Sequence, residues 1–451
     1  TKSPLYNRNQ EAEQVQPNFA PTNLAQNPFI GIVSNMKILF IADGRSPIAL
    51  NWIKYWTAHK HEVTLVSTYP TDVDLPLTRL EFLPVAFSRA KSSASASTVK
   101  KKSLLWGANT LKLRLALRHW LAPLTLPKAA TRLNEIIVEV QPDLVHALRI
   151  PYEGMLAGLA KSRAENFPTL LISIWGNDFT LHAPSTPLMG YHTRLALRNA
   201  DALHADCERD IHLAADWGFD ASRPSVVLPG AGGIDGNVFY PPSDTSLRGS
   251  NTADAISATD EETASQKDAR SDAPIIINPR GFRGYVRNDT FFKAIPLVLK
   301  ECPNAKFICP AMAGESQAEA WIQELGIQNA VTLTPPLAQK QLADTFRSAQ
   351  VLVSPSTHDG TPNSVIEGMA CGCFPICGDL ESIREWITDG ENGFLIDPAK
   401  PQALADAILR ALNKKSLRQQ ALERNQEIIA TRAEYEHSMA QAEIFYKRIV
   451  A

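Results

Sequence analysis

The chain has only six cysteines in 451 residues, and its net charge at pH 7 is only −2. So few cysteines cannot form the disulfide framework of a small secreted domain. A dedicated nucleic-acid binder would be strongly basic, so we expect no nucleic-acid partner. No apolar run reaches the ~18 residues that a membrane-spanning helix needs. The polar start of the sequence lacks the charged and apolar regions of a secretory signal, and we expect a cytoplasmic protein.

Three of the cysteines, Cys371, Cys373 and Cys377, are close together in the sequence. A metal site is conceivable there, but no nearby histidine completes a ligand set and the spacing does not fit a zinc knuckle. We interpret them as small buried residues between the end of a helix and the next strand. The sequence therefore predicts no metal.

The length predicts two domains, and 44% hydrophobic with 20% charged residues is typical of a globular protein. Two stretches interrupt this composition. Residues 1–35 are rich in Asn, Gln and Pro and indicate a flexible N-terminal extension. Residues 244–273 are dominated by Ser, Thr, Asp, Ala and Gly and indicate a flexible linker or insertion.

Short apolar runs alternate with helical segments in both 36–243 and 274–429. In the first region we expect strands at 37–43, 61–67, 143–146, 169–174, 202–205 and 225–228. In the second we expect strands at 275–278, 305–309, 330–333, 351–354 and 374–377. This alternation predicts an α/β protein with two doubly wound parallel sheets.

A polar stretch, 354–373, follows one of these strands and reads Ser-Pro-Ser-Thr-His-Asp-Gly-Thr-Pro-Asn-Ser-Val-Ile-Glu-Gly-Met-Ala-Cys-Gly-Cys. We expect a helix to begin here, with Thr361 as its N-cap and Pro362 at its first position. The amides of Asn363 and Ser364 then lack helical partners, and the helix dipole favours an anion. A strand-to-helix turn of this kind is typical of a diphosphate-binding site.

Two carboxylates flank the expected helix start: Asp359 just before it and Glu367 one turn in, with seven residues between them. This pattern resembles the E-x7-E signature of retaining glycosyltransferases of family four, the glycosyl transferases group 1. The run 379–398 also resembles that family. The first carboxylate in the family is usually Glu, whereas Asp359 is one methylene shorter.

The resemblance implies the GT-B fold, in which two Rossmann-like domains face a cleft. It implies an enzyme that transfers a sugar from a nucleotide diphosphate sugar to a hydroxyl of a glycan or lipid-linked acceptor, with retention and without a cofactor or metal. The first domain, 36–243, would hold the acceptor and the second, 274–429, the donor. A final helix within 430–451 would cross back onto the first domain.

The loop 279–288 carries Arg280, Arg283 and Arg287 and no acidic residue that could neutralise them. Guanidinium groups bind phosphate oxygens bidentately, and the loop follows a strand, where α/β folds bind ligands. We predict that two of the three bind the diphosphate; the alternative is a solvated surface loop. Glu367 can accept hydrogen bonds from both ribose hydroxyls, or it is an ordinary glutamate on a helix surface.

The remaining site candidates are spread over both domains. The resemblance places Asp359 at the donor sugar, and the alternative is a common Asp-Gly turn. His146 ends a strand, so we expect it to point toward the cleft, where family members often have a histidine; the alternative is a core residue. Asp178, in a pattern resembling W-G-x-D, contacts a sugar or caps the next helix. Gly44 and Arg45 follow the first strand, and we expect them under the acceptor.

The segment 89–132 holds ten Lys or Arg and no Asp or Glu, interleaved with Leu and Trp. It fits a surface that meets anionic lipid headgroups, which would make the protein peripheral at the inner face of the membrane. It equally fits a solvated pair of basic helices, because its apolar residues do not form one clean stripe.

Three rival functions belong to other classes. A nucleotide-sugar epimerase shares the fold, but no acid/base pair for it is identifiable. A non-catalytic module that binds nucleotide sugars or glycans is suggested by the change from Glu to Asp at position 359. A dehydrogenase is disfavoured because 230–236, which mimics a dinucleotide fingerprint, has the wrong spacing and precedes no expected helix.

Overall fold

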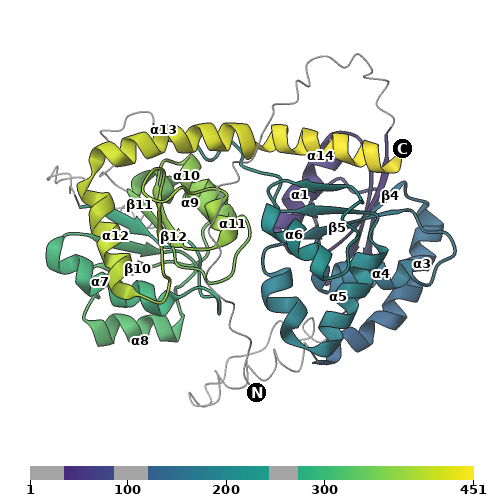
Figure 1. The fold of residues 1–451 in the computed structure, drawn as a ribbon, viewed down its shortest axis with the longest axis horizontal. Coiled ribbons are helices and arrows are strands. Elements are labelled where there is room, and N and C mark those ends of the chain that lie inside the picture. The colour runs from purple at the N-terminus through teal and green to yellow at the C-terminus, as the bar shows by residue number, and fades with distance from the viewer. Residues whose placement is uncertain (1–34, 86–119, 243–272) are drawn as a thin grey trace, which may run out of the picture. The chain divides into compact units, whose positions relative to one another are not determined.

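Two separate parallel β-sheets form the framework of the molecule (Figure 1). The computed structural model describes residues 35–85, 120–242 and 273–451. The predicted flexible segments 1–35 and 244–273, except for residues 35 and 273, and most of the basic segment 89–132 lie outside these residues. Residues 36–451 form one compact unit. The domain boundaries expected from the sequence stay a prediction.

The first sheet has seven strands in the order β3-β2-β1-β4-β5-β6-β7, and all its pairings are parallel. Its strands are β1 (Lys37–Ala42), β2 (Glu62–Ser67), β3 (Arg79–Phe82), β4 (Leu144–Ala147), β5 (Thr169–Ile174), β6 (Ala202–Ala205) and β7 (Ser225–Val227). Its helices include α1 (Pro47–Ala58), α3 (Leu126–Val140), α4 (Met155–Lys161), α5 (Pro187–Asn199) and α6 (Glu208–Asp216).

The second sheet has six parallel strands in the order β10-β9-β8-β11-β12-β13. Its strands are β8 (Ile275–Ile277), β9 (Lys306–Cys309), β10 (Val331–Leu333), β11 (Val351–Ser354), β12 (Phe374–Gly378) and β13 (Phe394–Ile396). Its helices are α7 (Asn288–Glu301), α8 (Ser316–Leu325), α9 (Gln339–Ser348), α10 (Asn363–Ala370), α11 (Glu381–Arg384), α12 (Pro401–Asn413) and α13 (Lys415–Arg432).

The strands predicted from the apolar runs are confirmed to within one residue at each end. Central strands such as β1 are buried on both faces, which is why they read as continuous apolar runs. Two further strands, β3 and β13, were not predicted from the apolar runs, and both lie at sheet edges. In β3 half-buried and exposed positions alternate, so its sequence carries no continuous apolar run.

The last helix, α14 (Tyr435–Val450), packs on the first domain. It follows α13 after a break at Ala433 (Figure 1). The Tyr446 ring stacks on Trp56 with centroids 4.1 Å apart, and its hydroxyl accepts a hydrogen bond of 2.9 Å from Trp52 Nε1. The chain therefore returns from the second domain to close one face of the first sheet.

In each sheet the strand order reverses direction at one place: between β1 and β4 in the first sheet, and between β8 and β11 in the second. Open α/β sheets bind ligands at the carboxyl ends of the strands at such a point. The loops after these four strands are therefore where a site is expected.

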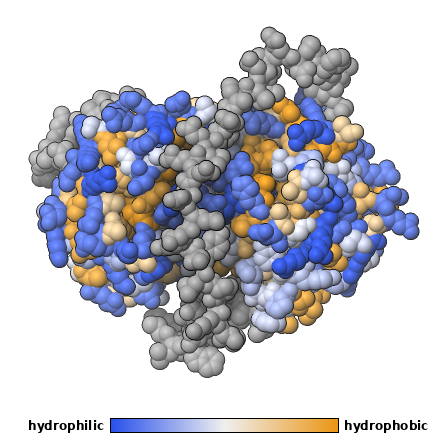
Figure 2. Space-filling view, viewed as in Figure 1, coloured by the Kyte–Doolittle hydropathy of each residue, from blue (hydrophilic) through white to orange (hydrophobic). Residues whose placement is uncertain are grey.

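The face shown in Figure 2 is mainly hydrophilic, with apolar patches over both domains. Among the described helices, none is both long enough and apolar enough to cross a membrane.

Candidate functional site

Two loops meet at the reversal point of the second sheet, one after β8 and one after β11. The Arg287 amide donates a 3.0 Å hydrogen bond to the Pro355 carbonyl, and the Thr357 amide donates one of 2.8 Å to the Tyr285 carbonyl. Val286 and Ser356 form an isolated antiparallel bridge. The arginine-bearing loop is thus fixed beside the loop that leads into α10.

Arg280 joins these loops through its side chain. Its Nη2 donates to Asp359 Oδ2 at 2.5 Å, and its Nη1 donates to Ser364 Oγ at 3.0 Å. The two charged side chains are only 12% and 11% exposed. Burial raises the pKa of the Asp359 carboxyl, although the Arg280 guanidinium opposes this. Three residues predicted from the sequence therefore form one connected polar group.

The helix begins later than expected. Pro362 is the N-cap of α10 and Asn363 its first residue, so the predictions of Thr361 as N-cap and Pro362 as first helical residue are wrong. The reason is a distant partner: the buried Thr361 hydroxyl donates to the Asp206 carbonyl and accepts a 2.9 Å hydrogen bond from Trp386 Nε1.

The amino end of α10 is still suited to an anion. Asn363 and Ser364 are the first helical residues and are half-buried. Their amides have no carbonyl one turn earlier in the helix, and the helix dipole places partial positive charge there.

Glu367 lies one turn further along α10 and is half-buried. Burial raises the pKa of Glu367 to about 7, against the opposing influence of Arg280. Glu367 is three residues after Ser364 on α10, so the two share one face of the helix, and Ser364 bonds to Arg280. The structure brings Arg280, Asp359, Ser364 and Glu367 together around the amino end of α10.

The other two arginines of the loop are placed differently. Arg287 Nε and Nη2 both bond to the Asp289 carboxylate at 2.8 Å. The expectation that no carboxylate neutralises the loop is therefore wrong, because Asp289 lies just beyond it in α7. Arg283 is exposed, and none of the carboxylates within 35–85, 120–242 and 273–451 forms a salt bridge with it.

His146 lies in the core rather than facing a cleft, so that expectation is wrong. It is fully buried on β4, with Nδ1 2.5 Å from the Tyr446 hydroxyl and Nε2 2.7 Å from Ser173 Oγ. Burial lowers the pKa of His146 well below its usual range, so the ring stays neutral. Successive side chains of a strand alternate between faces, and this one points to the face that α14 covers.

Asp178 follows β5 and is fully buried. Its carboxylate accepts hydrogen bonds from the Ile150 amide at 3.0 Å, the Trp175 amide at 3.2 Å and Arg149 Nη2 at 2.9 Å. The predicted cap on the next helix is wrong, because none of these donors belongs to that helix, and the predicted sugar contact stays a prediction. The side chain instead ties the loop after β4 to the loop after β5.

Gly44 and Arg45 lie at the carboxyl end of β1. The Gly44 amide donates to Ser67 Oγ at 3.1 Å, and a Cβ at this position would lie 2.6 Å from Thr71 Cγ2, so a larger residue would displace the Thr71 side chain. Arg45 bonds to Asp43 through Nε and Nη2, and its guanidinium lies 3.6 Å from the centroid of the Tyr69 ring. Their expected place under the acceptor stays a prediction.

Arg209, in the first turn of α6, was not predicted from the sequence as a site residue. Its Nη1 donates to the Asp359 carbonyl at 2.7 Å and its Nη2 to the Gly176 carbonyl at 2.9 Å. Glu385 of the second domain accepts from the Glu208 and Arg209 amides at 3.0 and 3.2 Å. A lone arginine between two acidic residues gives no sequence signal, because its partners are far away in the chain.

Asp206, Cys207 and Asp210 place possible metal-ligand atoms within 4.8 Å of one another, and all three residues are buried. Arg209, however, already bonds to Asp210 through Nε and Nη2. Burial, followed by the Asp210 charge, raises the pKa of Asp206 well above its usual range, which favours a neutral carboxyl. The cluster is thus compatible with a protonated Asp206 beside the ion pair of Arg209 and Asp210. The absence of a metal, expected from the sequence, stays a prediction.

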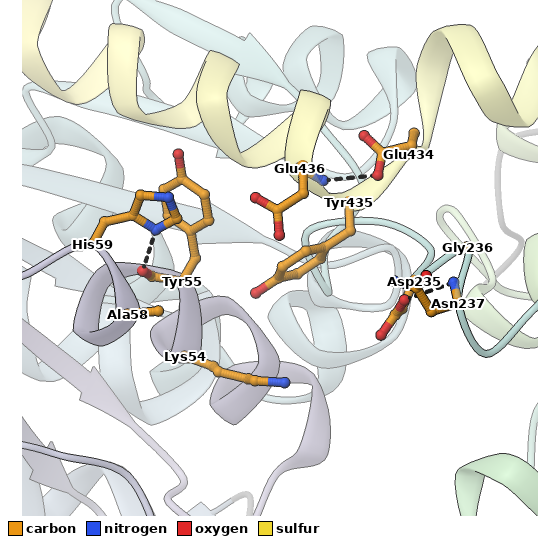
Figure 3. A pocket seen from close by; sticks show the side chains of 10 residues that line it. All are labelled: Lys54, Tyr55, Ala58, His59, Asp235, Gly236, Asn237, Glu434, Tyr435 and Glu436. Atoms are coloured by element: carbon orange, nitrogen blue, oxygen red, sulfur yellow. Dashed lines mark hydrogen bonds between the residues drawn. The ribbon is translucent and has the colours of Figure 1, made fainter.

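A pocket of about 320 Å³ lies elsewhere, between α1, residues 235–237 and the start of α14 (Figure 3). Glu434 caps α14 at its edge, accepting from the Glu436 and His437 amides at 3.2 and 2.7 Å. The pocket is lined by Lys54, Tyr55, Ala58, His59, Asp235, Gly236, Asn237, Glu434, Tyr435 and Glu436. None of the site residues predicted from the sequence lines it.

Comparison with known families matches both parts of the chain. Residues 44–230 match the glycosyl transferase 4-like domain, and residues 259–428 match the glycosyl transferases group 1.

Comparison with characterised proteins finds partial relatives. D-inositol 3-phosphate glycosyltransferase of Paenarthrobacter aurescens is 27% identical over 201 residues, which cover 44% of this chain and 45% of that protein. The enzyme of the same name from Streptomyces avermitilis is 31% identical over 127 residues, which cover 26% and 27%. The chain thus spans less than half the length of these two relatives.

Comparison with solved structures finds the same fold over nearly the whole chain. Sucrose-phosphate synthase from Thermosynechococcus elongatus superposes with a TM-score of 0.67 at 16% identity, covering 92% of this chain and 99% of that one. Anabaena Alr3699/HepE in complex with UDP-glucose superposes with a TM-score of 0.65 at 16% identity, covering 92% and 100%. At this identity the likeness establishes the two-domain fold, GT-B.

Proposed function

Because the chain belongs to the glycosyl transferases group 1 family, we propose that it transfers a sugar from a nucleotide diphosphate sugar to an acceptor hydroxyl. The observation that carries the proposal is the polar group at the amino end of α10. There Arg280, Asp359 and Ser364 are hydrogen-bonded to one another, and Glu367 lies one turn further on. A cation, free helix amides and a carboxylate are what a diphosphate attached to ribose requires.

In this proposal the diphosphate lies against the amides of Asn363 and Ser364, with Arg280 beside it. Negative charge builds on the diphosphate as its bond to the sugar breaks, and fixed donors that are already oriented stabilise that charge. Glu367 accepts hydrogen bonds from the ribose hydroxyls. Asp359 fixes Arg280 and lies where the donor sugar would follow the diphosphate.

For the donor we propose a uridine diphosphate sugar. The Anabaena structure with the same fold contains UDP-glucose, and the pneumococcal transferase GtfA, a further structural neighbour, contains UDP and GlcNAc. We further propose retention of configuration, with the acceptor attacking the face that the diphosphate leaves and the departing phosphate oxygen taking the acceptor proton. We propose that this chemistry proceeds without a metal.

For the acceptor we propose a glycan or lipid-linked hydroxyl held by the first domain, in a cytoplasmic protein at the inner face of a membrane. Trp120, Leu121 and Leu124 are 54%, 39% and 62% exposed, and they lie in the described part of the basic segment 89–132. Exposed apolar side chains beside basic residues favour anionic lipid surfaces.

A thermal-shift panel of UDP, GDP and ADP and their sugar conjugates tests the donor site. A nucleotide at ~100 times its dissociation constant adds about 2.7 kcal/mol to the free energy of unfolding. We expect a clear rise in melting temperature with at least one nucleoside diphosphate. A panel in which none of these compounds raises it contradicts the proposal.

A product assay separates the rival functions. We expect transfer of the sugar when the acceptor is present. Conversion of the donor to an isomer without any acceptor identifies an epimerase. Nucleotide binding without transfer or donor hydrolysis, both in the wild type and in Asp359→Ala, identifies a binding module.

A further inference from the structure

Arg149 follows β4, at the reversal point of the first sheet, and has an unusual backbone. Its φ is 109° and its ψ 159°, and Tyr152, three residues on, has a φ of 74°. Residues with a side chain rarely adopt positive φ, and they persist only where the surroundings hold them. Such backbone strain concentrates where a side chain must be presented to a ligand.

The surroundings that hold Arg149 are well defined. The fully buried Asp178 accepts a 2.9 Å hydrogen bond from Arg149 Nη2 and also bonds to the next amide in the chain, that of Ile150. The Gly154 amide donates a 2.9 Å hydrogen bond to the Arg149 carbonyl. The guanidinium carbon lies 5.6 Å from the centroid of the Trp175 ring. The direction of the side chain is therefore fixed by the protein.

Part of this guanidinium is left unused. Arg149 Nε is buried and has no hydrogen-bond partner among the described residues. Arg280 shows the same pattern: a carboxylate holds one end of its guanidinium, and its buried Nε has no partner among the described residues. Buried donors without a partner are costly and are satisfied by water or by a bound group. Fifteen buried side-chain atoms in the described residues lack a hydrogen-bond partner, and these two are the guanidinium nitrogens among them. Both arginines follow strands at the reversal points of the sheets, where open α/β sheets bind ligands.

The two arginines come from different domains, and the loops that hold them are in contact. Trp175, whose ring lies beside Arg149, is followed by Gly176, and a Cβ on Gly176 would lie 1.8 Å from the Gly360 nitrogen. Arg209 donates to the carbonyls of both Gly176 and Asp359. Since Asp359 holds Arg280, the loop beside Arg149 lies against the turn that fixes Arg280.

We propose that Arg149 is a first-domain ligand of the donor's diphosphate and that it binds the anion together with Arg280 of the second domain. This inference rests on the proposed function and adds to it a residue that neither the motif nor the sequence analysis indicated. One guanidinium from each domain on the same anion also makes diphosphate binding favour the arrangement in which the domains are in contact.

The test compares Arg149→Met and Arg149→Lys with a matched control, Arg132→Met. Arg132 is a first-domain arginine that is 44% exposed and paired with Glu135. Titration calorimetry measures how the full chain binds a nucleoside, its monophosphate and its diphosphate. The base is that of the diphosphate, among UDP, GDP and ADP, that raises the melting temperature most in the thermal-shift panel. We expect Arg149→Met to weaken diphosphate binding about 10-fold or more, and Arg149→Lys to weaken it less. Arg149→Met should weaken nucleoside binding about 2-fold at most. Arg132→Met should bind like the wild type.

A second measurement on the wild type does not depend on the folding of a variant. Arginines are modified with p-hydroxyphenylglyoxal with and without the same diphosphate, and the modified peptides are quantified by mass spectrometry. We expect the diphosphate to protect Arg149 and not Arg132.

The inference is overturned if Arg149 is modified equally with and without the bound diphosphate, or if Arg149→Met weakens nucleoside and diphosphate binding by the same factor. In either case the wild type still binds the diphosphate, and the proposed function stands. A wild type that binds none of the three diphosphates overturns both.

Discussion

Arg280 Nη2 lies 2.5 Å from Asp359 Oδ2, and this contact joins the loops after β8 and β11. Both side chains are almost completely buried, so neither charge is balanced by water. A buried ion pair of this kind is costly to form and more costly to break. The ion pair lies at the reversal point of the second sheet, and we infer that its role is to fix the Arg280 guanidinium beside the amino end of α10.

Replacing Arg280 by Met removes the cation and leaves Asp359 buried without its partner. We expect the transfer rate to fall by roughly 10²-fold to 10³-fold, as for other single donors that stabilise transition-state charge. Initial rates at saturating acceptor measure this. Arg384→Met is the control, because Arg384 is an exposed second-domain arginine paired with Asp379. Equal rates for Arg280→Met and the control contradict the role of Arg280.

Glu367→Gln tests the ribose contact. A neutral amide accepts hydrogen bonds more weakly than a carboxylate, so we expect UDP to bind about 10-fold more weakly. The control is the ligand: 2′,3′-dideoxy-UDP has no ribose hydroxyls, so its affinity should be the same for wild type and variant. Titration of both ligands into both proteins completes the cycle. A loss of similar size for the two ligands means that Glu367 acts on something other than the ribose.

Glu153→Gln tests a buried carboxyl in the first domain. Burial raises the pKa of Glu153 to about 7, partly offset by a 2.7 Å hydrogen bond from Thr68. The folded state therefore holds this proton more tightly than the unfolded chain, whose glutamates titrate near pH ~4.3. The contribution of Glu153 to the free energy of unfolding is therefore fully present below pH ~4.3 and is lost as the pH rises through about 7.

Denaturant unfolding of wild type and Glu153→Gln at pH 5 and pH 8 measures the effect. We expect the variant to lose less stability than the wild type between these two values. Glu135→Gln is the control, since Glu135 is 55% exposed. The prediction fails if Glu153→Gln and the wild type lose the same free energy of unfolding over this range.

Arg209→Met tests the contact between the domains. The change removes hydrogen bonds to the Asp359 and Gly176 carbonyls and leaves Asp210 buried without a cation. We expect a loss of about 3 kcal/mol in the free energy of unfolding, typical of breaking a buried pair. We also expect a larger radius of gyration in small-angle scattering. Arg132→Met serves as control, and a variant as compact and stable as this control refutes the prediction.

The sequence predicted the strands other than β3 and β13, the helix after 354–362 and the grouping of Arg280, Asp359, Ser364 and Glu367, because these depend on local patterns and on the ends of strands. The predictions failed where the position of a side chain depends on a residue that is distant in the sequence. Thr361 does not cap α10 because its hydroxyl bonds to Asp206, and His146 is a core residue because α14 brings Tyr446 onto it. Arg149 and Arg209 carry no motif, since their partners are brought near only by the fold.

A crystal structure of the protein with bound UDP tests the central claim most directly. The account predicts diphosphate oxygens within hydrogen-bonding distance of the Asn363 and Ser364 amides and of Arg280, with Glu367 at the ribose hydroxyls. A diphosphate bound elsewhere on the protein, with Arg280 still engaged only with Asp359 and Ser364, would contradict it.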